Sequence, residues 1–354
     1  MRSRPSRQLA LLLAVASLAC QSAGIPEDEI PGDLIAFNYR TPEEARRRAD
    51  AWDDEQKDQH GAARSRAGAD AQLSTSGEMH SSTDQLGDFF AKVLGRSDEV
   101  EAAAPGRLAL LDPRTRTVVV LEAARRGSIP LGWSPDRKRL LFAQPGDRDF
   151  QVYEYDREVG TVRPVTHAPP AHTHACYASE GRIVVGAADP RSSTPRTRIE
   201  VSRPGGGGPF TPLTEWGTEH SPACSPDGHS VVWVRENADG RTELRLRVLG
   251  EGTETLSLAP VRQPRFSPDG MWIVYSAPLH KEWRIWRVRP DGTGRAPIGA
   301  GQRNEGRPTL SPDGRFVAYV ASEAPPRRHL YLRRFDGSGD RILFADGDGE
   351  NPVW

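Results

Sequence analysis

Histidine and glutamate side chains occur at short intervals ahead of apolar segments in the second half of the chain, and both residue types can do chemistry. His172 and His174 precede one such segment, and Glu219 and His220 precede the next. Imidazole nitrogens are common metal ligands, and glutamate with histidine can supply general acid and base groups. The three histidines are therefore candidates for a metal site, and the His and Glu residues are candidates for acid–base chemistry on a polysaccharide.

The same loop position carries polar side chains of both charge signs in later segments, which is more typical of a ligand-binding rim than of a catalytic centre. We predict ligand binding at the following residues: His172, His174, Trp216, Glu219, His220, Arg262, Gln263, Asn304, Glu305, Arg307, Glu350 and Asn351. Histidines on loops are most often ordinary surface residues, so we predict no metal and no cofactor. The chain has no Gly-x-Ser-x-Gly or His-Glu-x-x-His motif and no phosphate-loop signature.

A short pattern repeats through this region: an aromatic or apolar residue, then Ser-Pro-Asp-Gly or a variant of it, then an apolar strand. The copies begin at positions 133, 177, 224, 266 and 310, so the steps are 44, 47, 42 and 44 residues. Proline, aspartate and glycine in this order are typical of a tight turn. We therefore predict a structural, turn-capping role for the carboxylates of Asp136, Asp227, Asp269 and Asp313.

Each copy reads as four short strands, and this period is typical of propeller blades. The pattern resembles the WD-type repeat of TolB-like proteins over about residues 129–354. The resemblance implies a β-propeller, a binding role and protein partners in the cell envelope, and it carries over no catalytic residue. A solenoid is the alternative arrangement.

We expect an all-β fold: a six-bladed propeller of four-stranded blades, spanning 30–354, whose ring closes by pairing strands from both ends. The last residues, 351–354, read as the innermost strand of a sixth blade, and the segments 30–39 and 107–122 supply its other three strands. The remaining blades are predicted at about 129–170, 174–215, 220–259, 263–299 and 307–346. The alternative is five full blades and a fragment.

Residues 40–104 form an insert in the closing blade. Thr41, Pro42 and Glu44 make a helix-start signature, and we predict a polar helix to about Gln59. Residues 60–82 are rich in Gly, Ala and Ser and are predicted to be disordered, and 84–94 has the period of a second amphipathic helix. Helices covering one end of the propeller are favoured over a mobile partner-binding arm.

Residues 1–19 have the organisation of a signal peptide: a basic start, an apolar run of about ten residues and small residues before Cys20. Ala16 to Cys20 resembles a bacterial lipobox, although Ser17 stands where leucine is usual. We predict lipidation at Cys20, a linker over 20–29, export, and anchoring to the outer membrane, with ordinary cleavage near Ala19 as the alternative. The membrane is then contacted only through the lipid anchor.

The composition excludes some partners. The chain has 47 basic and 48 acidic residues and a formal net charge of −1, so no strong field favours nucleic acid. The other two cysteines, Cys176 and Cys224, hold near-equivalent places in neighbouring blades. An exported protein meets an oxidising compartment, so a disulfide is the alternative. We predict buried thiols there, because inner strands of different blades are usually too far apart for a disulfide. No self-association surface is evident, and we expect a monomer.

The leading interpretation is a non-enzymatic binding or scaffold protein of the envelope. It would recognise a protein, peptide or glycan through the propeller surface and the channel mouth. The alternative is a polysaccharide lyase or hydrolase that uses the His and Glu residues of the same mouth.

Overall fold

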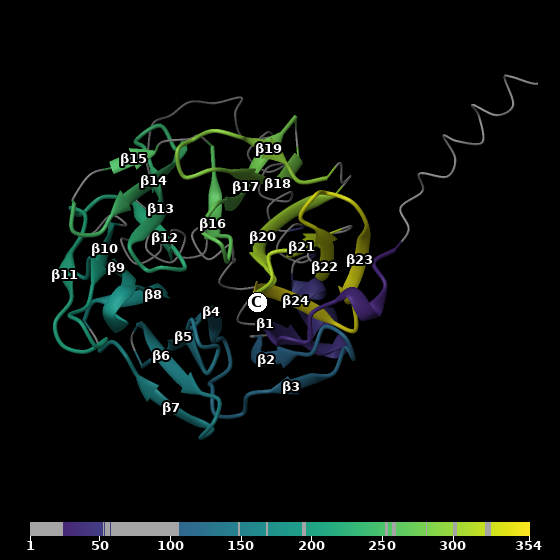
Figure 1. Ribbon diagram of the computed structural model, residues 1–354. Helices are drawn as coiled ribbons and strands as arrows, with labels where there is room; N and C mark the ends of the chain where they lie inside the picture. Colours follow the sequence, from purple (N-terminus) through teal and green to yellow (C-terminus); the bar gives the residue numbers. More distant parts are fainter. Residues whose placement is uncertain are drawn as a thin grey trace, which may run out of the picture.

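The computed structural model places six four-stranded antiparallel sheets in a ring around a central axis (Figure 1). It describes residues 24–51, 53, 57 and 106–354, with short gaps at 148, 168, 193–195, 252–253, 257–259, 281, 300–302 and 323–326. The predicted six-bladed propeller is confirmed, and so is the all-β class.

The strands follow one another in chain order within five blades. Blade 1 contains β4 (Ile129–Trp133), β5 (Arg139–Pro145), β6 (Phe150–Asp156) and β7 (Thr161–Pro164); blade 2 contains β8 (Ala171–Tyr177), β9 (Ile183–Ala188), β10 (Thr197–Val201) and β11 (Thr211–Pro212); blade 3 contains β12 (Glu219–Cys224), β13 (Ser230–Glu236), β14 (Thr242–Val248) and β15 (Glu254–Leu256); blade 4 contains β16 (Arg262–Phe266), β17 (Ile273–Leu279), β18 (Glu282–Val288) and β19 (Ala296–Pro297); blade 5 contains β20 (Asn304–Leu310), β21 (Phe316–Ser322), β22 (His329–Arg334) and β23 (Asp340–Phe344). Two 3-10 turns complete the description, η1 (Glu27–Glu29) and η2 (Ser179–Gly181).

Blade 6 is assembled from both ends of the chain, in the order β24 (Asp348–Val353), β1 (Ile35–Arg40), β2 (Arg107–Leu111) and β3 (Val118–Val120). Ala36 pairs with Val353 and Asn38 with Glu350. The Trp354 indole donates to the carbonyl of Asp33 at 2.9 Å. The predicted closure of the ring is therefore confirmed, and it leaves neither chain end as an unpaired inner strand.

The Ser-Pro-Asp turns join the innermost strand of a blade to the second strand. In the turn at Ser267, the serine hydroxyl donates to Asp269 Oδ1 at 2.5 Å, and the same oxygen accepts from the Met271 amide at 3.0 Å. Asp136, Asp227 and Asp313 have the matching serine and amide partners. In blades 3, 4 and 5 the residue after the aspartate is a glycine at positive φ. In blade 1 this residue is Arg137, with φ of 60°. These contacts support the predicted turn role, which remains a prediction.

The segment 24–34 lies along blades 5 and 6 (Figure 1). It is on the side of these turns, since Arg315, which follows the turn of blade 5, donates to the Glu29 carbonyl at 3.1 Å. Ile25 and Ile30 are buried in the core shared by the two blades. Arg334 pairs with Glu29 at 2.8 Å, and Arg341 donates to the carbonyl of Ile25 at 2.8 Å. The chain is thus fixed to the turn side of the ring before its first strand begins.

The insert begins with a helix over 42–51, and residues 53 and 57 are also helical. The Thr41 amide donates to Glu44 at 2.9 Å and the Glu44 amide donates to the Thr41 hydroxyl at 3.3 Å, which confirms the capping box. Arg48 of the helix pairs with Asp348 at 3.2 Å and Glu350 at 3.1 Å. The helix is therefore fastened to the start of β24, and the predicted features at 60–82 and 84–94 lie outside the described residues.

Candidate ligand-binding channel

Two cavities lie along the axis of the ring, at opposite ends of the innermost strands β4, β8, β12, β16, β20 and β24. The strand-start cavity has a volume of about 60 Å³ and is lined by residues near the beginnings or middles of these strands, among them His174, Gln263, Arg307 and Asn351. The turn-side cavity has a volume of about 420 Å³ and is lined by the ends of all six strands and by the Ser-Pro-Asp turns. Only the second is of a size typical for a ligand pocket.

Four of the twelve predicted residues line the strand-start cavity, and three of these are joined in a chain of hydrogen bonds. The Arg307 amide donates to Gln263 Oε1 at 2.9 Å, and the Arg307 guanidinium donates to Asn351 Oδ1. Asn351 in turn donates to Asn38 of β1 at 2.7 Å. The polar side chains thus bond to one another around the axis, which uses part of their capacity to bind a ligand.

The backbone around the strand-start cavity has unusual φ angles. Ser221, Gln263, Arg307 and Asn351 have φ of 53°, 53°, 56° and 51°, and each lies at a register shift directly before a proline. A non-glycine residue held at positive φ costs about 1–3 kcal/mol of folding free energy. A bulge changes the direction in which its side chain points. The strain is repeated in four blades, and the recurring prolines were its only sign in the sequence.

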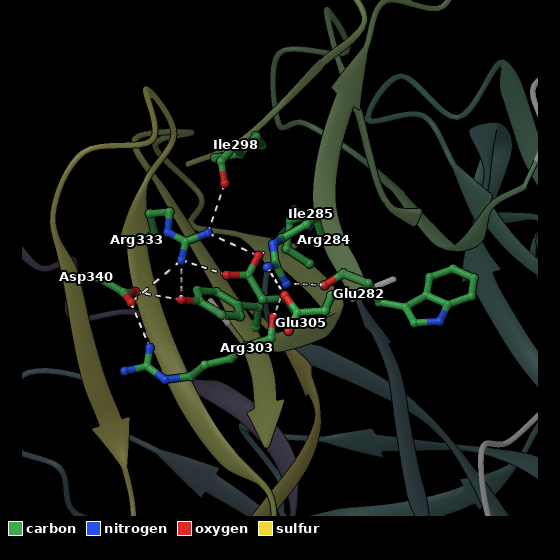
Figure 2. Close-up of polar contacts among 10 residues, drawn as sticks. Glu282, Arg284, Ile285, Ile298, Arg303, Glu305, Arg333 and Asp340 are labelled. Atoms are coloured by element: carbon green, nitrogen blue, oxygen red, sulfur yellow. Dashed lines mark hydrogen bonds and ion pairs between the residues drawn. The ribbon is translucent and has the colours of Figure 1, made fainter. Parts of the chain in front are cut away.

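The Glu305 carboxylate is buried and bonded within the fold (Figure 2). Arg333 of β22 contacts it twice, at 2.8 and 3.1 Å, and the Ile285 amide of blade 4 donates to it at 3.3 Å. Arg333 also donates to the Tyr319 hydroxyl at 2.8 Å and lies 3.6 Å from Asp340. Glu305 therefore links blades 4 and 5.

The other two predicted glutamates are also buried and paired. Glu350 contacts Arg40 at 3.3 Å, Arg48 at 3.1 Å and Arg328 at 2.9 Å. Burial alone would raise the pKa of Glu350, but the arginines hold it well below its ordinary value. Glu219 accepts from the Trp233 indole at 2.9 Å. A general acid needs a raised pKa and access to substrate, and Glu350 has neither.

The three predicted histidines do not converge. His172 is buried, 3.2 Å from Gln151 and 3.8 Å from Glu200. His174 and His220 instead share one neighbour, the hydroxyl of Ser221, at 3.4 and 3.0 Å. Among the residues that the structure describes, no group of three or more His, Cys, Asp or Glu side chains could hold a metal ion. Burial, with repulsion from neighbouring cationic groups, lowers the pKa of His174 to about 3, so its imidazole is neutral.

The remaining predicted residues line neither axial cavity. The Arg198 guanidinium lies 4.0 Å from the ring centroid of Trp216, and Arg262 lies 4.0 Å from that of Trp283. Asn304 accepts from the Trp283 amide at 3.0 Å. Trp216 and Glu219 also line a separate cavity of about 430 Å³, together with Arg235 and Arg247. The predicted rim is therefore divided between the small axial cavity, this separate cavity, buried ion pairs and cation–π contacts.

None of the twelve predicted ligand-binding residues lines the turn-side cavity. Six side chains that directly precede the turns, or stand at the matching place, contribute to its wall: Trp133, Tyr177, Cys224, Phe266, Leu310 and Trp354. Arg137 and Arg265 are the only charged side chains among its lining residues. The signal was the aromatic or apolar residue of the repeat itself, which was interpreted only as part of the fold.

The prediction of free thiols at Cys176 and Cys224 is wrong. The two form a disulfide between blades 2 and 3, with their Cα atoms 5.6 Å apart. The prediction assumed that inner strands of different blades are too far apart for a bond. Here the ends of β8 and β12 lie close enough for a bond, and both cysteines line the turn-side cavity.

The fold is a six-bladed β-propeller similar to that of TolB proteins. A TolB structure from Acinetobacter baumannii aligns with all of this chain and 74% of its own, at a TM-score of 0.64 and 15% identity. A structure assigned to TolB of Agrobacterium tumefaciens aligns with 68% of this chain and 89% of its own, at a TM-score of 0.58 and 23% identity. The predicted resemblance is confirmed at the level of the fold.

Other comparisons are less specific. A chain of Kuenenia stuttgartiensis hydrazine synthase aligns with 70% of this chain and 43% of its own, at a TM-score of 0.57 and 13% identity. An uncharacterized protein of Agrobacterium fabrum is 29% identical over 151 residues, so the match spans 37% of this chain and about half (49%) of that relative. No family model matches the chain. The fold therefore occurs in proteins of different function, and the site must carry the functional argument.

Proposed function

We propose that this protein is a non-enzymatic binding protein of the bacterial envelope, which holds a protein or peptide partner at the turn-side cavity. The observation that carries the proposal is the contrast between that cavity and the predicted acid–base residues. The cavity has a volume of about 420 Å³ and a wall of aromatic, aliphatic, serine and arginine side chains, whereas Glu305 and Glu350 are buried and bonded to other parts of the fold. A pocket of this kind is suited to recognition.

The location of the cavity supports a macromolecular partner. It opens among the turns of the blades, so a segment of a partner can enter it while the rest of the partner lies across the propeller face. The TolB-type fold and the resemblance of the repeats favour a protein partner in the envelope over a glycan. Acid–base cleavage of a polysaccharide is disfavoured, because Glu350 is paired with three arginines.

We further propose that residues 1–19 direct export and that Cys20 carries a lipid anchor in the outer membrane. The basic start, the short apolar run and the small residues before Cys20 support this proposal. Within the described residues, no helix combines the length and apolar character needed to cross a bilayer. We expect the mature protein to be a monomer held at the membrane by this lipid alone.

A cavity-filling variant tests the proposed function. A Cβ at Gly132 would meet only the Ala175 carbonyl oxygen, at 4.0 Å, so Gly132→Leu can place a side chain in the cavity with little change elsewhere. Gly207→Leu is the matched control, because nothing lies within 4 Å of a Cβ there. Both variants and the wild type are expressed as full-length anchored protein and cross-linked in the envelope.

We expect one specific partner to be captured by the wild type and by Gly207→Leu, and to be lost with Gly132→Leu. Capture that is unchanged in Gly132→Leu would place the partner elsewhere on the propeller. The absence of any specific partner, together with turnover of an envelope polysaccharide, would refute the proposal in favour of an enzyme.

A further inference from the structure

Arg265 of β16 occupies a distinctive position, because it lines both axial cavities. Within the described residues, its guanidinium donates to two backbone carbonyl oxygens and no other acceptor: that of Pro264 at 3.1 Å and that of Leu131, across the axis in blade 1, at 3.4 Å. A guanidinium has five N–H donors. Several donors of Arg265 therefore remain for a group that enters the channel.

The other deeply placed arginines differ from Arg265 in having a carboxylate partner. Arg40 pairs with Glu350 at 3.3 Å, Arg48 with Asp348 at 3.2 Å, and Arg333 with Glu305 at 2.8 Å. Among the described residues, no ion pair forms at Arg265. A buried charge without a counter-charge is costly, so the fold maintains at this point an unneutralised cation that a ligand could neutralise.

The charge of Arg265 persists at neutral pH. Burial lowers the pKa of its guanidinium to about 10, which still leaves the group protonated at pH 7. The side chain keeps some accessible surface because it borders the cavities. The cation is therefore both deep in the fold and reachable from the turn side.

The side chains that line the turn-side cavity indicate which chemical groups a negatively charged ligand of Arg265 would carry. Aromatic and aliphatic surface comes from Trp133, Tyr177, Phe266, Leu310 and Trp354, and the serines of three turns add hydroxyl groups. Among the described lining residues, none has an acidic side chain. The other lining cation is already engaged: Arg137 donates to the carbonyl of Leu34 at 3.0 Å and lies 4.0 Å from Asp33. Within the described part of the chain, the cavity thus offers one planar cation without a carboxylate partner, next to aromatic and aliphatic side chains, which is suited to one carboxylate on an apolar stem.

Building on the proposed function, we propose that the turn-side cavity binds the carboxyl-terminal end of a peptide chain that finishes with an apolar residue. The terminal carboxylate pairs with the Arg265 guanidinium, and the last side chain lies against the ring of aromatic residues. Specificity then has two parts, the negative charge of the chain end and the apolar character of its final side chain.

The test uses full-length protein and N-acetyl-L-phenylalanine as the probe, with N-acetyl-L-phenylalanine amide as its neutral counterpart. Ligand-observed NMR titration should show the acid binding at least tenfold more tightly than the amide. Equal affinity for the two, or no binding of the acid at millimolar concentration, would overturn the inference. This comparison needs no variant and is independent of folding effects.

A second arm identifies the source of the carboxylate. N-acetyl-glutamic acid α-amide carries its carboxylate on a side chain and lacks the apolar group, so it should bind more weakly than N-acetyl-L-phenylalanine. If it binds as tightly, the assignment to a chain end is wrong.

Variants locate the interaction. Arg265→Met should abolish the preference for acid over amide, and Arg265→Lys should retain part of it because a single charge remains without the planar fork. Arg241→Met is the matched control, since the Arg241 side chain is 77% exposed. Retention of the full preference by Arg265→Met would overturn the role of Arg265.

The two proposals fail in distinguishable ways. If the envelope partner is captured through the cavity but the acid and the amide bind equally, only the chain-end inference fails. If the acid binds through Arg265 but no partner is captured, the cavity is a small-molecule site and the proposed function fails.

Discussion

The two ends of the channel are built from the same six strands, yet they differ in chemistry and in space. At the strand-start end, polar and charged residues bond to one another and leave a cavity of about 60 Å³. At the turn side, aromatic, aliphatic and serine side chains leave about 420 Å³ open, with Arg265 at its floor. The end that is rich in reactive side chains is closed, and the end that is poor in them is open.

This difference shows that residue type alone is a weak guide to a site in a propeller. A carboxylate near the axis is surrounded by neighbouring blades, and burial makes an arginine partner necessary. Glu305 and Glu350 meet that need and so become links between strands. Apolar residues around a widening channel cannot fill it, and the space they leave can admit a ligand.

Removal of a carboxylate at the strand-start end should have the largest effect. Glu350→Ala leaves Arg40, Arg48 and Arg328 without their shared partner, and breaking a buried pair costs about 3–5 kcal/mol. Urea unfolding of the purified protein measures the loss. Asp239→Ala is the control, because Asp239 and Arg241 form an exposed pair worth about 0–1 kcal/mol. Equal losses of unfolding free energy in Glu350→Ala and Asp239→Ala would show that Glu350 has no special structural role at the strand-start end.

The disulfide should give the next largest effect, at the turn side. Replacing both Cys176 and Cys224 by serine removes a cross-link between residues 48 apart and should cost about 2–4 kcal/mol of unfolding free energy. Reducing agent should destabilise the wild type to the level of the double variant and leave that variant unchanged. A wild type that is indifferent to reductant would show that the bond does not form in solution.

Acidification should weaken the strand-start end. The folded-state pKa of His174 is about 3, below its ordinary value of 6.5, so the unfolded chain takes up a proton first as the pH falls. The lowered pKa of His174 therefore contributes to the free energy of unfolding in full above about pH 6.5. This contribution is lost progressively as the pH falls toward 3. Between pH 7 and pH 5 the loss should reach at most about 2 kcal/mol. His174→Gln should show a smaller loss in urea unfolding at the two pH values, and an identical loss would contradict this assignment.

The smallest effect is expected from the turns that frame the open end. Asp269→Ala removes bonds to the Ser267 hydroxyl and the Met271 amide and should cost about 1 kcal/mol in thermal or urea unfolding. Binding of N-acetyl-L-phenylalanine should not change. A loss of binding with intact stability would instead give this carboxylate a role in the site.

Much of the fold could be predicted from the sequence because the repeat encodes it directly. The period and the Ser-Pro-Asp turns specify the blades, and the strand-like segments 30–39, 107–122 and 351–354 specify the closure. Each is a local signal whose structural meaning depends little on distant residues. The capping box at Thr41 and Glu44 is predictable for the same reason.

The site was harder to predict, because burial and partnership are properties of the assembled ring. Nothing near Glu305 in the chain reveals that Arg333 will meet it, and nothing near Cys176 reveals how closely β8 approaches β12. Arg265 was not predicted because an arginine in a strand is ordinary, and what distinguishes it is that no carboxylate of the described residues pairs with it. Such absences become visible only when neighbouring blades are in place.

The attachment of segment 24–34 also determines how the molecule would be oriented in a cell. Three residues separate Cys20 from Gly24, and a span of that length reaches about 14 Å at full extension. If Cys20 is acylated, such a short linker keeps the outer edge of blades 5 and 6 close to the lipid headgroups. The propeller would then tilt about that edge, and the open end of its channel would face targets that lie close to the bilayer.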